Sequence, residues 1–216
     1  MKLISPFFIC MVLSGCGYSN GSVNDDKDFV PPKVEVFDKE LYKKTGQGAT
    51  SYLKPDGYEV FEMDFDDFGG FQKERLPKPS FYTLYKEFYP NGHLKKRELR
   101  IGTHVPVGES LYYNEDGSLT RKTNEDLKFG SIKPDSILSI LERKGLIDRS
   151  SGRGTIDLEG RPAFELQFKH EGKQKIWLVT IHNAKQNVPP FDSIGEPPAT
   201  LPLIYKLDGE TGEEIL

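Results

Sequence analysis

The chain has 216 residues, a formal net charge of -4 and a mean hydropathy of -0.53. A net acidic chain lacks the basic footprint that general nucleic-acid binding requires, and this length allows one large or two small domains. Aromatic residues make up 12% of the chain, a share that suits a sheet-rich core.

The first 15 residues have the pattern of a bacterial secretory signal. Lys2 precedes an apolar run over residues 3–13, and small residues lead into Cys16. This ending resembles a lipobox, which implies cleavage before Cys16 and attachment of lipid (diacylglycerol and a fatty acid such as palmitate) to its thiol and new amine. Gly17 stands where inner-membrane retention usually has Asp, so the resemblance favours an outer-membrane lipoprotein facing the periplasm. The alternative is an ordinary signal peptide that ends near a cysteine.

Residues 16–32 have the composition of a disordered tether, because they are rich in Gly, Ser and Asn and end at two prolines. The chain has only two cysteines. Cys10 lies in the signal and Cys16 is the expected lipid site, so no disulfide is expected even in the oxidising periplasm.

Residues 33–130 carry the signals of strands and tight turns. Residues 61–66 alternate apolar and acidic side chains with period two, as in a half-buried strand. We expect the odd positions of this strand to face the core, which leaves Glu62, Asp64 and Asp66 in a row on the outside. A solvated acidic face, a contact strip for a basic partner and a calcium site with Asp67 are the three interpretations of this row.

An internal repeat follows, in which residues 87–94 are echoed by residues 111–119. Each copy has an aromatic pair, a turn ending in Asn-Gly or Asp-Gly, and a leucine. These dipeptides favour the positive φ angles of a tight turn, so each copy predicts a β-hairpin. Residues 52–58 form a weaker third copy, and the repetition predicts one meandering sheet.

The repeat resembles the MORN-variant repeat of bacterial antitoxin-like and surface lipoproteins, over about residues 81–122. In the second copy Asp116 replaces Asn and one residue is added. The resemblance implies stacked hairpins, and it implies a role shared with immunity proteins among others.

Residues 131–216 are expected to form a second unit. Pro134 and Asp135 suit the first turn of a helix, an apolar stripe follows at residues 137–141, and Gly145 provides a left-handed stop. Strands are predicted at about 155–159, 162–169 and 174–182, with a closing strand at 203–208. This order and the turn at 208–212 resemble the PepSY-like module of secreted bacterial proteins.

No residues form a recognisable catalytic set. The four histidines (His93, His104, His170 and His182) lack metal-ligand spacing, and neither a nucleophile elbow nor a phosphate loop is present. We therefore expect no enzyme activity, metal or cofactor. Arg153, between two glycines, is either an anion-binding residue or a solvated turn residue.

The loop at residues 187–198 carries two Pro-Pro pairs with Phe191 between them. Proline pairs stiffen a chain toward extended geometry. Phe191 is then either a buried cover residue or an exposed anchor for a protein partner.

These observations predict an α+β fold that is predominantly antiparallel β, with an N-terminal β-hairpin meander followed by a small helix-plus-sheet unit. The leading function hypothesis is a lipid-anchored periplasmic protein that binds protein, most specifically an immunity protein that neutralises a toxin delivered to the envelope, for instance by a type VI secretion system. Glu62, Asp64, Asp66 and Phe191 are the candidate contact residues. An accessory module that assists assembly or restrains a peptidase is the alternative.

Overall fold

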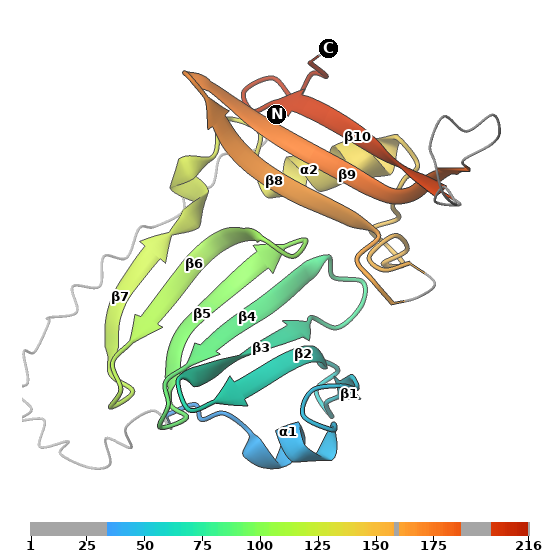
Figure 1. The fold of residues 1–216 in the computed structure, drawn as a ribbon. Coiled ribbons are helices and arrows are strands. Elements are labelled where there is room, and N and C mark those ends of the chain that lie inside the picture. Colours follow the sequence, from blue (N-terminus) through green and yellow to red (C-terminus); the bar gives the residue numbers. More distant parts are fainter. Residues whose placement is uncertain (1–33, 158–159, 187–199, 216) are drawn as a thin grey trace, which may run out of the picture. The chain divides into compact units, whose positions relative to one another are not determined.

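The computed structural model describes residues 34–157, 160–186 and 200–215. Antiparallel sheet dominates, and helices are few (Figure 1). Residues 34–216 form one compact unit. The expected signal, the tether, Cys16 and Phe191 lie outside the described residues. Within the described part of the chain, no helix has the length and apolar character needed to cross a membrane.

The larger sheet is a seven-stranded antiparallel meander in which each strand pairs with its neighbours in sequence. Its strands are β1 (Tyr52–Leu53), β2 (Glu59–Asp66), β3 (Gly69–Arg75), β4 (Tyr82–Phe88), β5 (Leu94–Ile101), β6 (Val105–Tyr113) and β7 (Leu119–Asn124). Helix α1 (Lys39–Lys44) precedes it, and the short helix η1 (Glu125–Lys128) follows it.

All three copies of the repeat build the same hairpin turn. In the first full copy, the amide of Tyr89 donates to the carbonyl of His93 (2.9 Å) and the amide of Gly92 donates to Tyr89 (2.8 Å). Residues 54–58 and 114–118 repeat this pair of bonds. The joined strands are β1–β2, β4–β5 and β6–β7, so the predicted meander is present in the structure.

The geometry of these turns differs from the expected one. Gly92 and Gly117 have φ of 86° and 84°, but Asn91 and Asp116 do not have positive φ. The carboxamide of Asn91 instead accepts the amide of His93 (2.9 Å), and Asp116 accepts that of Ser118 (2.8 Å). Each turn is therefore a three-residue loop with a single left-handed glycine; the expected positive φ is confirmed at Gly92 and Gly117 and is not found at Asn91 or Asp116.

Strand β2 shows why the period-two prediction holds only in part. Met63 is buried and Phe65 packs against the same core, as expected. Val60 is also buried, because the register shifts between Val60 and Glu62. The bulge at Phe61 exchanges the two faces of the strand, so the odd-position rule fails before Glu62.

Helix α2 (Pro134–Arg143) and a three-stranded sheet make up the C-terminal part. The sheet has the order β10-β9-β8, with β8 (Phe164–Glu171), β9 (Gln174–Gln186) and β10 (Thr200–Asp208). Helix α2 ends as predicted: Gly145 has φ of 71°, and the amide of Leu146 reaches the carbonyl of Leu141 (3.0 Å). The strand expected at 155–159 is absent from its described part, residues 155–157, where an isolated bridge joins Ile156 to Pro162 between the turns at Gly154 and Gly160.

Two apolar clusters form on the face of the large sheet that we call the inner face. One cluster joins β5 and β6 to α2, β8 and β9, with Ile101, Val105, Leu141, Leu166 and Trp177 among its buried members. The other joins α1 to β2, β4 and β5. Helix α1 was not predicted from the sequence; the carboxylate of Asp38 caps it by accepting the amide of Leu41 (2.8 Å).

Charged side chains lie on the same inner face. Glu74 on β3 is only 2% exposed, and its Oε1 accepts from Gln72 (2.5 Å), Lys86 (2.7 Å) and Lys54 (2.9 Å). Lys86 also pairs with Glu35 (2.5 Å). This buried ion cluster ties the segment before α1 to strands β3 and β4.

Candidate binding face

The opposite side of the large sheet, the outer face, is identified by strand register. Cross-strand partners share a face, so the register of β2–β7 places one set of side chains together: Glu62, Asp64, Phe71, Lys73, Arg75, Tyr85, Glu87, Lys96, Glu98, Arg100, Tyr112 and Arg121. Except for Glu98, every one of these residues keeps part of its surface exposed. The outer face is therefore an accessible surface of aromatic and charged groups.

Aromatic rings on this face carry cations above them. The guanidinium of Arg100 lies 3.7 Å from the ring centre of Tyr85, and that of Arg121 lies 3.9 Å from Tyr112. The ammonium of Lys96 lies 5.5 Å from the same Tyr112 ring. Such stacking fixes long side chains in extended positions on the sheet. The exposed groups are thus partly ordered before any partner arrives.

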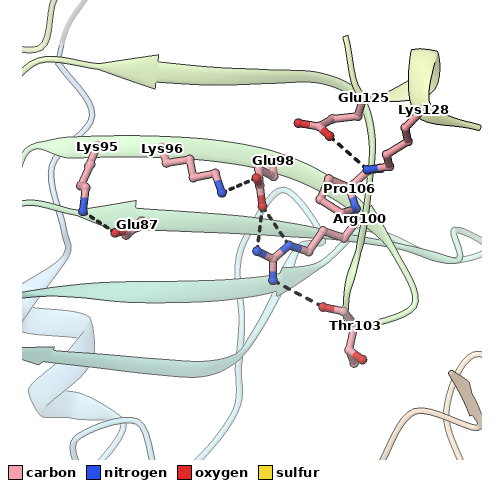
Figure 2. Close-up of polar contacts among 9 residues, drawn as sticks. All are labelled: Glu87, Lys95, Lys96, Glu98, Arg100, Thr103, Pro106, Glu125 and Lys128. Carbon is pink, nitrogen blue, oxygen red and sulfur yellow. Dashed lines mark hydrogen bonds and ion pairs between the residues drawn. The ribbon is translucent and has the colours of Figure 1, made fainter. Parts of the chain in front are cut away.

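Glu98 is the centre of the polar network on this face (Figure 2). It is 2% exposed and accepts from Arg100 at 2.7 and 3.1 Å as well as pairing with Lys96. Arg100 also donates to the carbonyl of Thr103 (3.4 Å). Lys96 and Arg100 therefore converge on one buried carboxylate, which fixes their positions on the outer face.

Flanking pairs extend the network along β4, β5 and η1 (Figure 2). Lys95 pairs with Glu87 (2.6 Å), and this hydrogen bond raises the pKa of Lys95. Lys128 donates to the carbonyl of Pro106 (2.9 Å) and to Glu125 (3.0 Å). Burial alone would raise the pKa of Glu125, but the neighbouring Ser110 hydroxyl and the ion pair with Lys128 outweigh burial and lower it. Both groups keep their charges at neutral pH.

The structure places the three predicted acidic residues along β2, all of them exposed. Glu62 pairs with Lys73 of β3 (2.7 Å). Asp64 accepts the hydroxyl of Tyr42 (2.8 Å), a bond that raises the pKa of Tyr42. Asp66 accepts the amide of Phe68 (2.7 Å) in the turn to β3. The row therefore borders the outer face, with part of its charge neutralised.

The cations of the outer face were missed from the sequence. Lys73, Arg100 and Arg121 belong to different strands, and only pairing across the sheet brings them beside the aromatic rings. Residues 95–98 and 100 are all charged, so this segment shows no period-two pattern that would assign Lys96 and Arg100 to one face of the strand.

The histidines and the carboxylates of β2 lie apart from one another. Nδ1 of His93 lies 2.5 Å from the carbonyl of Glu115, and Nε2 of His182 lies 3.7 Å from Glu165. Over residues 34–157, 160–186 and 200–215, no three His, Cys, Asp or Glu side chains come together as a metal site. Arg153 is bridged through its backbone to Asp148, whose pKa is lowered to about 2 by hydrogen bonds from Ser150 and Ser151.

Three hollows of similar size lie elsewhere on the described residues. One, of about 350 Å³, is lined by Leu84, Arg97 and Leu111 of the inner face. A second, of about 360 Å³, lies between Leu53, Pro77 and Ile156. The third, of about 410 Å³, is lined by Glu165 and His182 among others. Arg75 of the outer face also lines the second hollow, but none of the three contains the stacked pairs Tyr85–Arg100 and Tyr112–Arg121.

Comparison of the chain with protein-family models, with curated proteins and with solved structures found no match.

Proposed function

We propose that this chain is a lipid-anchored periplasmic protein that binds another protein through the outer face of its large sheet. The main observation in support of this proposal is the ordered array of two tyrosines and two arginines on an accessible surface: Tyr85, Tyr112, Arg100 and Arg121. Tyrosine and arginine are enriched among the residues that dominate binding energy at protein interfaces. Side chains that are already ordered lose little entropy when a partner docks.

The most specific form of the proposal is an immunity protein that neutralises a toxin acting in the envelope. The lipobox-like ending at Cys16 and the hairpin repeat support it. Neutralisation requires only that a rigid surface covers an active site. An antiparallel meander with both signs of charge on one face suits that task, since complementary charge gives specificity and a fast association rate.

The experiment measures capture of a partner from the envelope of the native cell. Full-length protein carrying Tyr85→Ala or Tyr112→Ala should bind the captured partner at least tenfold more weakly, because each change removes a ring that holds an arginine in place on the face. Tyr205→Ala is the matched control, since Tyr205 on β10 also lies beneath a cation, Lys144, at 4.3 Å. Unchanged affinity of both outer-face variants would refute the proposed surface.

The identity of the captured protein tests the finer claim. A toxin whose activity is inhibited by the purified chain supports immunity. A peptidase or an assembly component supports the accessory-module hypothesis instead. Cys16→Ser should leave an unprocessed or soluble form; labelling with a fatty-acid analogue that still marks this variant would contradict the lipid anchor.

A further inference from the structure

Strand β7 forms one edge of the large sheet in the part of the chain that the structure describes. It is the last strand in the sheet order and pairs only with β6 among the described strands. Five of its six residues are exposed and the sixth is half-buried, so neither of its faces is covered. An open edge offers unpaired amide and carbonyl groups over the length of the strand, about 20 Å for six residues.

The charges on this edge disfavour a second copy as its occupant. Arg121 and Lys122 lie at the middle of the strand, on opposite faces. If two copies of β7 paired antiparallel with all six residues aligned, Arg121 of each copy would face Lys122 of the other. With five residues aligned, Arg121 would face Arg121 or Lys122 would face Lys122. Like charges directly opposite destabilise a strand pair. The edge is therefore better matched to a strand that carries carboxylates.

Arg121 is available for such a strand. Its guanidinium is held over Tyr112 at 3.9 Å, and no described carboxylate pairs with it. Lys122 has only a distant, exposed pairing with Glu109 (3.7 Å). An arginine held in place can accept a carboxylate through two parallel hydrogen bonds. Apolar contacts are offered at both ends, by Leu119 (48% exposed) and by Leu127 in η1 (80% exposed).

From these features we infer that β7 binds an extended acidic segment of the partner protein as an eighth strand. Backbone hydrogen bonds along the edge supply affinity, while carboxylates on both faces of the added strand pair with Arg121 and Lys122. The inference rests on the proposed function, because Arg121 of β7 also belongs to the outer face, where it stacks on Tyr112 of β6, so that the two surfaces would form one continuous interface.

The test uses the full chain and a capped eight-residue peptide in which pairs of adjacent glutamates are separated by valine and threonine, so that both faces of its strand carry carboxylates. Peptide binding should slow hydrogen exchange of the backbone amides of β7 at least tenfold, with smaller changes in β2 and β3. A peptide with the same side chains but N-methylated at every residue should lose this protection, because it keeps the charge and has no amide hydrogen to donate along either edge. Equal protection by both peptides would overturn strand addition.

Charge reversal supplies the second arm. Arg121→Glu with Lys122→Glu should weaken binding of the acidic peptide at least tenfold and should allow a lysine-containing peptide to bind instead. Lys173→Glu, in the exposed turn before β9, is the control and should change neither result. Protection of β7 in a dimer without peptide would also overturn the inference. If the native chain captures a partner but does not bind the acidic peptide, the inference about β7 is refuted and the proposed function stands. If the native chain binds the peptide but captures no partner, the proposed function is refuted.

Discussion

Single glycines determine the turns of the repeat. Gly92 has φ of 86°, and a Cβ added there would lie 3.4 Å from Val36, an ordinary contact. Backbone strain is therefore the main cost of a side chain at this position. Gly92→Val should lower the free energy of unfolding by about 1 to 3 kcal/mol, because a β-branched residue resists positive φ. Gly92→Asn is the control and should cost less, since Asn tolerates the left-handed region; equal melting temperatures for the two variants would contradict this account.

The buried ion cluster gives a second prediction for single residues. Lys86→Met leaves the carboxylate of Glu74 buried with one ammonium partner fewer. Loss of one partner of a buried pair costs about 3 to 5 kcal/mol. Denaturant unfolding should show a loss of this size, and the double variant Glu74→Gln, Lys86→Met should recover part of it. No recovery in the double variant would mean that Lys86 contributes by packing rather than by charge.

The same cluster makes stability depend on pH in a defined direction. Burial alone would raise the pKa of Glu74, but Lys86 and Lys54 outweigh burial and hold it below its ordinary value. A carboxyl group with a lowered folded pKa stabilises the protein above its unfolded pKa, and this contribution is lost as pH falls through the folded value. Thermal melts below pH 4.5 should therefore show a steeper loss of stability in the native chain than in Glu74→Gln. Parallel pH profiles would contradict the assignment.

Some residue roles follow from sequence and others do not. Pro134, Gly145 and the turn glycines act through local backbone geometry, and their positions could be predicted without the fold. The ion partners Glu74 and Lys86 lie twelve residues apart on neighbouring strands. No local pattern pairs them, because their contact arises from the register of β3 with β4.

At the scale of elements, strand β2 brings an acidic row to the border of a face rich in cations. If Glu62, Asp64 and Asp66 contact a basic partner, lysine substitution of all three should slow association. The effect should shrink at high salt, because exposed charges are screened within about 8 to 10 Å. Surface-binding kinetics at two salt concentrations measure this. A change confined to the dissociation rate would show that β2 makes close contacts instead.

Elements were predicted best where a local turn or cap defines them. The hairpins of β4–β5 and β6–β7 and helix α2 are such cases. Helix α1 was missed because its six residues bury only Leu41, too little for a visible apolar stripe. The outer face was missed as a site for a related reason: it is assembled from side chains of six strands, and a bulge at Phe61 shifts the face assignment within β2.

At the scale of the whole molecule, one apolar cluster spans the two units expected from the sequence. Ile101 and Val105 of the large sheet are buried in the same cluster as Leu141 of α2 and Trp177 of β9. Neither set of residues could stay out of water if the other were removed, and exposure of buried apolar side chains costs about 1.5 to 3 kcal/mol each. The residues around 130 therefore join two structural parts that stabilise each other.

This shared core predicts one cooperative unfolding transition for residues 34–216. Trp177 is the only tryptophan in the chain and lies on β9, so its fluorescence reports the C-terminal part and the core that this part shares with the large sheet. Far-UV circular dichroism is dominated by the larger sheet, which has seven of the ten described strands. The two signals should give the same midpoint in a urea titration, as two-state behaviour requires. Leu141→Ala should lower both midpoints together and reduce the unfolding free energy by about 2 to 5 kcal/mol. Separate midpoints, or a Leu141→Ala effect seen only by fluorescence, would show that the large sheet holds its structure without α2.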